Sequence, residues 1–159
     1  MTVEIPCVSI RTHCIHMVHD ILDALGQHPR LSYKQLTHAV GTTDWILYNC
    51  LQMLCLHAMV GRSSTRSYKN AKFWRLSDTP HLDVDSDNIV ALMNTYPDQK
   101  FGLFDLLPRL HWTFDDEDIG TRKRKIAWRC LILCAYNKLA MDEHNSHRVY
   151  FHKPDTIHQ

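Results

Sequence analysis

The stretch SYKQLTHAVGTTDWILYNCLQMLCLHAMVGR, residues 32–62, decides the fold of this chain. Its first part carries a capping-box pattern, in which Ser32 begins a helix and Gln35 stands three residues later. Gly41 ends that helix, because glycine readily takes the left-handed conformation that follows a last helical turn. The sequence therefore predicts a short helix from Ser32 to Val40.

The second part of the stretch predicts a longer helix followed by a β-hairpin. Thr42, Thr43 and Asp44 are good caps for a helix that runs to about Leu56. After it come two segments rich in strand-forming residues, with a polar stretch between them that is typical of a flexible loop. The three segments are Ala58–Arg62, Lys72–Leu76 and the loop Ser63–Asn70.

A further helix precedes the stretch, because apolar residues recur at helical spacing from Ile15 to Leu25 and Gly26 follows them. The order of helix, short helix, helix, strand, basic loop and strand resembles a winged-helix unit. The sequence pattern that carries the resemblance is Leu51-x-x-Leu54 followed by Ala58-Met59-Val60-Gly61. The resemblance covers residues 13–78, and it implies that the third helix and the hairpin loop, called the wing, contact DNA.

The same order of elements returns after a polar, acidic segment, which is a linker or the cap of the next helix. The expected elements are the helices Ile89–Tyr96, Phe101–Leu107 (cut by Pro108) and Thr121–Lys138, and the strands Leu139–Glu143 and Arg148–His152 around a turn at Asn145-Ser146. Aligning the third helices pairs Cys50 with Cys130. The sequence predicts a mainly α protein with small β-hairpin wings (α+β), made of two tandem winged-helix-type units. These are residues 1–78 and 89–159, joined by a linker at 79–88.

The composition is that of a folded protein without an export or membrane segment. The chain has 159 residues, of which 45% are hydrophobic and 22% charged, and its formal net charge is +1. Attraction to nucleic acid therefore has to come from local patches. No apolar run approaches the roughly 20 residues that span a membrane, and Met1–Arg11 lacks the core of a signal peptide. We expect a cytoplasmic protein with reduced cysteines.

The predicted helix Thr121–Lys138 has a basic face. The cations on its outward stripe and near its start are Arg122, Lys123, Arg124, Lys125 and Arg129. Such a stripe suits phosphate and base contacts, so these residues are predicted to bind nucleic acid. Two alternatives stay open: a solvated basic face, and a face that the acidic run 115–118 shields until a partner displaces it.

The predicted third helix of the first unit differs, because its outward face is largely apolar and lacks Lys and Arg. Such a face is rarely left in water. We expect it to pack against the other unit, a second copy of the chain in a homodimer, or a protein partner. The interface residues are Trp45, Ile46, Met53 and Leu56. The alternative for this helix is reading of DNA by its polar residues, chiefly Thr43 and Asn49.

The first wing carries five cations and no acid between Arg62 and Arg75. A basic loop of this kind can follow a phosphate backbone or enter a minor groove, and it suits DNA and RNA equally. The residues predicted to bind nucleic acid are Arg62, Arg66, Tyr68, Lys69 and Lys72. A hairpin whose lysines only discourage aggregation is the alternative.

Signals for chemistry at a site are absent from the sequence. His13, Cys14, His16 and His19 cluster, but the paired ligands of a structural zinc site are missing. Neither a glycine-rich nucleotide-binding motif nor a nucleophile–base set stands out. We therefore expect no catalytic residue, no metal and no cofactor, and do not expect an enzyme.

Together these patterns predict a DNA-binding transcriptional regulator, of repressor type, that contacts duplex DNA through the basic wing and the basic third helix. A dimer would match a two-fold symmetric DNA site. The alternative is an adaptor or inhibitor that binds a protein partner through the apolar helix face, because one fold can serve unrelated functions.

Overall fold

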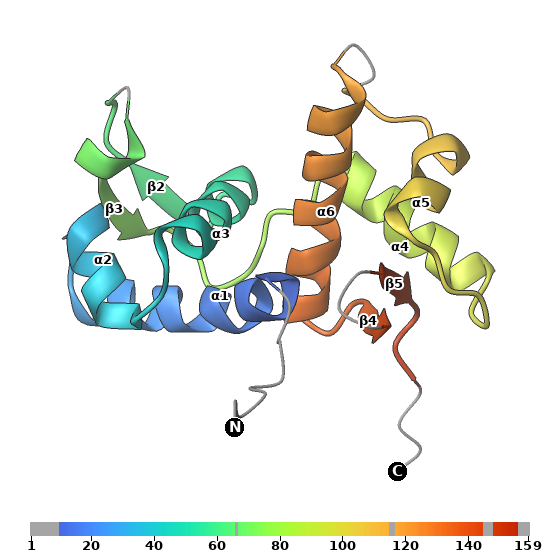
Figure 1. Ribbon diagram of the computed structural model, residues 1–159, viewed down its shortest axis with the longest axis horizontal. Coiled ribbons are helices and arrows are strands. Elements are labelled where there is room, and N and C mark those ends of the chain that lie inside the picture. The colour runs from blue at the N-terminus through green and yellow to red at the C-terminus, as the bar shows by residue number, and fades with distance from the viewer. Residues whose placement is uncertain (1–9, 66, 115–116, 145–147, 156–159) are drawn as a thin grey trace, which may run out of the picture. The chain divides into compact units, whose positions relative to one another are not determined.

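The computed structural model describes residues 10–65, 67–114, 117–144 and 148–155. The chain divides into two compact units, Ile10–His81 and Leu82–Gln159. Figure 1 draws the first in blue to green and the second in yellow-green to red. Within the described residues, each unit contains three α-helices and a small antiparallel sheet. The α+β class with mainly helical content is therefore confirmed.

In the first unit, three α-helices precede a β-hairpin. The elements are α1 (Ile10–Gln27), β1 (Leu31–Ser32), α2 (Tyr33–Val40), α3 (Asp44–Leu56), β2 (Val60–Arg62), the 3-10 turn η1 (Tyr68–Asn70) and β3 (Lys72–Arg75). The capping box of α2 is present, because Gln35 N–H donates to Ser32 Oγ (3.1 Å) and Ser32 N–H donates to Gln35 Oε1 (2.8 Å). Gly41 follows α2 with a φ of 63°. The bounds predicted for α2 and α3 are confirmed, whereas α1 is longer than predicted.

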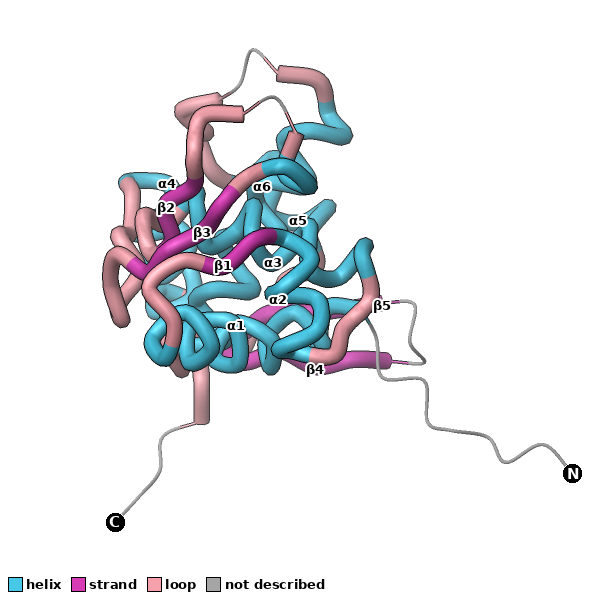
Figure 2. Tube along the Cα trace, turned by 90° about the vertical axis from the view of Figure 1, so that its left-hand side faces the viewer, coloured by secondary structure: helices cyan, strands magenta, loops and turns pink. Residues whose placement is uncertain are grey.

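The sheet of the first unit contains one strand that the sequence pattern missed. This strand is β1, and its two residues are too few to show an alternating pattern. β3 lies between β1 and β2, with Leu31 paired to Phe73 (Figure 2). The strand predicted to begin at Ala58 begins instead at Val60, since Ala58 is left-handed with a φ of 56°.

The core of the first unit lies between α1, α2, α3 and β3. Its fully buried apolar side chains include Val18, Ile21, Leu36, Leu47, Leu51, Leu54 and Phe73. Cys14 and Cys50 are buried with them, where a thiol behaves as a small apolar group. Because Leu47, Leu51 and Leu54 all point inward, the opposite side of α3 is the side that solvent reaches.

The second unit has the same order of helices and hairpin. Its elements are α4 (Val84–Thr95), α5 (Leu103–Arg109), α6 (Ile119–Ala135), β4 (Ala140–His144) and β5 (Arg148–His152). Asp83 caps α4 by accepting a hydrogen bond from Ser86 N–H (2.9 Å), so this helix begins inside the segment 79–88. Pro108 lies within α5 instead of ending it, and α6 stops before Lys138. The turn expected at Asn145-Ser146 lies outside the described residues.

Backbone contacts of the first unit return in the second. Met59 N–H donates to the Leu54 carbonyl (3.0 Å), and Lys138 N–H donates to the Leu133 carbonyl (2.9 Å). The strand contact ahead of the second helix is also repeated. The paired residues are Leu31 with Phe73 in the first unit and Phe101 with Phe151 in the second. The two units therefore end their third helices in the same way.

This repetition corrects the register expected from the sequence. Ala58 and Asn137 follow the third helices with φ values of 56° and 60°, and so take equivalent positions. Cys50 then corresponds to Arg129 and not to Cys130. The expected alignment is wrong by one residue, because it matched the Cys-Leu pairs of the two helices. The left-handed residues and the matching backbone hydrogen bonds at the helix ends decide the register instead.

Candidate nucleic-acid interface

A chain of hydrogen bonds fixes the wing of the first unit to its third helix. Tyr68, in η1, donates from Oη to Gln52 Oε1 on α3 (3.1 Å). Gln52 in turn donates from Nε2 to Tyr48 Oη (2.7 Å). The Tyr48 and Tyr68 rings meet edge to face, with centroids 5.2 Å apart. The polar loop expected to be flexible is therefore packed against α3 at this point.

Tyr68 also connects the wing to the sheet beneath it. Its ring centroid lies 5.7 Å from that of Phe73, which is fully buried in β3. The Arg62 guanidinium stacks on the Tyr68 ring at 4.3 Å from the centroid. Burial raises the pKa of Tyr68 to about 12, although the Arg62 charge acts to lower it. Tyr68 is thus a half-buried anchor of the wing as well as a predicted contact residue.

Replacing Tyr68 by Phe should lower the free energy of unfolding by about 0.5–1.5 kcal/mol, the usual net value of one hydrogen bond. The ring contacts with Phe73 and Arg62 would remain, so the loss reports the hydrogen bonds of the Tyr68 hydroxyl, to Gln52 and to Cys55. Urea denaturation followed by circular dichroism measures it. Tyr96→Phe, at an exposed tyrosine of the second unit, is the matched control and should change little. Equal effects of both variants would mean that the hydrogen bonds of the Tyr68 hydroxyl stabilise nothing.

The described cations of the wing point outward to different degrees. The Lys69 side chain is 71% exposed and lies 3.8 Å from the Asp44 carboxylate at the start of α3. Lys72 is exposed, and Arg62 is half-buried against Tyr68. Arg66, which was predicted to bind nucleic acid, lies outside the described residues. These cations place positive charge beside the first turn of α3.

The fifth cation of the wing segment is turned away from this surface. Arg75 donates from Nη1 to the Leu22 carbonyl of α1 (3.2 Å) and forms an ion pair with Asp78. A charge that is bound in this way stabilises the end of β3 and contributes little to an outward basic patch. Arg75 is therefore not part of the candidate interface.

The exposed side of α3 is polar and aromatic. The prediction of a continuous apolar face on this side is therefore wrong. Met53 is 1% exposed and belongs to the core, and Ile46 is half-buried. Trp45 (59% exposed) and Leu56 (39%) reach solvent, but they stand at opposite ends of the helix. The sequence analysis placed Met53 on the outward face because it took the row of leucines as the whole buried side of α3. The buried arc of α3 is wider than that row. Tyr48 and half-buried residues lie between the two exposed ends.

The predicted DNA-reading residues of α3 lie on the solvent side. Thr43 is exposed and caps the helix, accepting a hydrogen bond from Ile46 N–H at 3.5 Å. Asn49 is half-buried and donates from Nδ2 to the Trp45 carbonyl (2.9 Å). Because residues three and four apart share a helix face, Trp45, Tyr48 and Asn49 form one surface. This surface and the wing cations make up the candidate interface.

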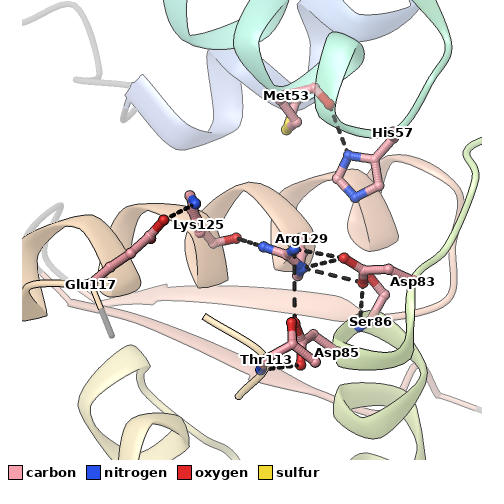
Figure 3. A network of polar contacts seen from close by, with 9 residues as sticks. All are labelled: Met53, His57, Asp83, Asp85, Ser86, Thr113, Glu117, Lys125 and Arg129. Carbon is pink, nitrogen blue, oxygen red and sulfur yellow. Dashed lines mark hydrogen bonds and ion pairs between the residues drawn. The ribbon is translucent and has the colours of Figure 1, made fainter. Parts of the chain in front are cut away.

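In the second unit, Arg129 is not on an outward stripe, and its predicted contact with nucleic acid is corrected. Its side chain is 5% exposed and binds Asp83, with Nη2 to Oδ2 at 2.6 Å and Nε to Oδ2 at 3.1 Å. Arg129 Nη1 donates to the Lys125 carbonyl (3.1 Å), and the Arg129 Cζ atom lies 4.8 Å from the centroid of the Phe114 ring. Figure 3 shows this cluster. The helical spacing placed Arg129 outward, and this prediction is wrong because acids distant in sequence draw the cation inward.

A second, fully buried acid completes the Arg129 cluster. Asp85 Oδ2 lies 3.9 Å from Arg129 Nη2, and Asp85 Oδ1 accepts a hydrogen bond from Thr113 N–H (3.2 Å). Burial raises the pKa of Asp83, but hydrogen bonds from Arg129 and Ser86 outweigh it and hold this pKa at about 2. Sequence reasoning missed this cluster, although acids at a helix start are a signal that could have suggested ion pairs.

The other predicted cations of α6 are partly engaged within their own unit. Lys125 pairs with Glu117 of the acidic run (Figure 3), and Lys123 lies 4.1 Å above the Phe104 ring. Arg124 is exposed and Arg122 is half-buried. The pair with Glu117 agrees with the expected shielding of this face by the run 115–118, of which residues 115–116 lie outside the described residues.

Charge divides unequally between the two units. Between Ile10 and His81 there are eight Lys and Arg residues and four Asp and Glu residues, a formal charge of +4. Between Leu82 and Gln159 there are ten and twelve, a formal charge of −2. The nearly neutral chain thus contains one basic unit.

Neither a metal site nor a membrane helix is found in the part of the chain that the structure describes. No group of three or more His, Cys, Asp or Glu side chains there could hold a metal ion. None of the helices there has the length and hydropathy needed to cross a membrane. No protein-family model and no curated protein matches the sequence.

Proposed function

We propose that the chain is a tandem winged-helix protein that binds duplex DNA through its first unit and acts as a transcriptional regulator of repressor type. The fold assignment is supported by the element order α1-β1-α2-α3-β2-β3, whose strands form one sheet in the order β1-β3-β2. It is also supported by the return of the same elements and helix ends in the second unit. In such units the third helix and the wing are the parts that meet DNA.

The observation that carries the proposal is the joining of the wing to the exposed face of α3. Tyr68 binds Gln52, and Lys69 lies beside Asp44, so both parts are held as one surface. Phosphate contacts position a protein on DNA, and side chains on an exposed helix read the bases. The wing supplies cations for the first task, and α3 supplies exposed polar and aromatic groups for the second.

The second unit is the weaker candidate for DNA contact. Of its five predicted cations, Arg129 is buried, Lys125 is paired and Lys123 is stacked on an aromatic ring. Its net charge is negative, which opposes attraction to phosphate. Arg124 remains exposed and can add a contact. The main binding surface is therefore assigned to the first unit.

The test is fluorescence anisotropy with a labelled random-sequence duplex over a range of salt concentrations. About three phosphate contacts should weaken binding roughly 40-fold between about 50 and about 200 mM salt. The variant Lys69→Ala/Lys72→Ala should bind more weakly, and the magnitude of the slope of log K against log salt should fall by about two. Repeating the titration with duplex RNA tests the preference for DNA.

The matched control removes the same charge from the second unit. Lys138→Ala/Lys153→Ala should leave both the affinity and the salt slope nearly unchanged. Equal weakening by both double variants would show that net charge alone attracts the DNA, against the proposed surface. Absence of binding at low salt would refute the proposed function.

A protein-binding adaptor remains the second candidate, on the single observation that Trp45 is 59% exposed. An exposed tryptophan is a common anchor of protein interfaces, self-association included. Sedimentation velocity of the chain and of Trp45→Ser separates the two. Self-association that is lost in this variant while DNA affinity persists would show that Trp45 serves a protein contact and not the DNA surface, as the adaptor requires.

A further inference from the structure

The α3 helix cannot make the commonest specific contact with guanine. That contact is made by Arg or Lys, which donates two hydrogen bonds to guanine O6 and N7. The whole of α3, Asp44–Leu56, is described, and it contains neither Arg nor Lys. Its solvent side offers amide, hydroxyl and aromatic groups instead. Any base reading by this helix therefore uses other chemistry.

The two amides on this side are not equally available to a ligand. The Gln52 amide is committed at both ends, because its Nε2 donates to Tyr48 and its Oε1 accepts from Tyr68. Asn49 uses one hydrogen of Nδ2 to bind the Trp45 carbonyl within the same helix. This leaves Asn49 Oδ1 and the second Nδ2 hydrogen for a ligand. An amide with one acceptor and one donor matches adenine N6 and N7 in the major groove.

The groups around Asn49 suit the partner base of adenine. Trp45 is 59% exposed and Tyr48 is 38% exposed, and Thr43 stands exposed at the helix start. Apolar and methyl-bearing side chains of this kind contact the thymine methyl group, which also lies in the major groove. Adenine and thymine contacts are thus available on one helix face, one turn apart.

We propose that the α3 face reads A·T base pairs in the major groove, with Asn49 as the specificity-determining residue. The proposal rests on the proposed function, in which the wing cations hold the phosphate backbone. Base contacts specify the sequence and phosphate contacts do not, so the two sets of residues should separate in experiment.

The experiment compares three duplexes of equal length by competition anisotropy at one salt concentration: A·T, G·C and inosine·cytosine. Inosine lacks the guanine 2-amino group, so the inosine·cytosine duplex has the major-groove groups of G·C and the minor-groove groups of A·T. The wild type should prefer A·T over both other duplexes, by roughly 5- to 150-fold for each bidentate contact. Asn49→Ala should lose most of the preference for A·T over the other two duplexes, with an unchanged salt slope.

Lys69→Ala/Lys72→Ala is the control, and it should weaken binding to all three duplexes while keeping the A·T preference. Asn49→Ala is expected to fold, because alanine is the better helix former, and circular dichroism checks this. Equal binding of A·T and inosine·cytosine would place the reading in the minor groove and overturn the inference, with the proposed function intact. Equal binding of all three duplexes by the wild type would show no base reading, and would also overturn the inference with the proposed function intact. Binding to none of them would refute both.

Discussion

Replacing Arg129 by alanine should lower the free energy of unfolding by about 3–5 kcal/mol, the cost of leaving a buried charge without its partner. The Arg129 side chain is 5% exposed, and Asp85 beside it is fully buried. Loss of the guanidinium leaves Asp85 with the hydrogen bonds of Thr113 and removes its ion pair with Arg129. Urea denaturation followed by circular dichroism measures the change.

Two variants show that the loss comes from the buried charge. Arg124→Ala removes the same charge from the exposed side of the same helix, and it should change the free energy of unfolding by less than about 0.5 kcal/mol. Arg129→Met/Asp85→Asn removes both charges while keeping most of the volume, and should recover much of the loss. A stability of Arg129→Ala close to that of Arg124→Ala would contradict the burial of this cluster.

The same cluster makes stability depend on pH in the acid range. The pKa of Asp83 is about 2 in the folded chain, below its ordinary 3.8. A lowered pKa contributes stability that is present above the ordinary value and is lost as the pH falls toward about 2. Arg129→Met removes the hydrogen bonds that hold this pKa low. Melting temperatures between about pH 5 and pH 2 should therefore fall more steeply for the wild type than for this variant.

Replacing Phe73 by alanine should cost about 3–5 kcal/mol, as expected for a large aromatic side chain that is removed from a core. Phe73 is fully buried, pairs with Leu31 of β1 and packs against the ring of Tyr68. Its loss leaves a cavity and removes the side chain against which Tyr68 of the wing packs. The affinity for duplex DNA should fall as well, even at temperatures where the variant is folded.

Phe73→Leu and Leu76→Ala are the controls for this prediction. Leucine keeps much of the buried apolar area, so the first variant should lose less stability. Leu76 is 57% exposed just after β3, so its truncation should change stability by less than about 0.5 kcal/mol. If the wing depends on its packing against Phe73, the affinity for duplex DNA falls in Phe73→Ala and is kept in Leu76→Ala. Full DNA affinity of a folded Phe73→Ala protein would show that the wing does not depend on this anchor.

Much of the backbone could be predicted because local contacts decide it. The start of α2 depends on the reciprocal bonds of Ser32 and Gln35, and its end depends on Gly41. Thr43 sets the start of α3 in the same way. These contacts join residues only a few positions apart, so their pattern can be read directly from the sequence. The exposure of the wing cations Lys69 and Lys72 likewise follows from a polar loop and a short strand.

The tertiary structure alone decided which of the remaining predicted site residues reach solvent. Arg129 is drawn inward by Asp83, which lies 46 residues away in the chain, and no helical wheel contains such a partner. Met53 is buried because α3 contacts elements on more than one side, which widens its buried arc.

The commitment of the Gln52 amide has the same origin. The sequence by itself thus determined the helices, their caps and the basic character of the wing, which are properties of neighbouring residues. Which amide and which cations remain available to a ligand depends on contacts between distant segments. Only packing brings these segments together.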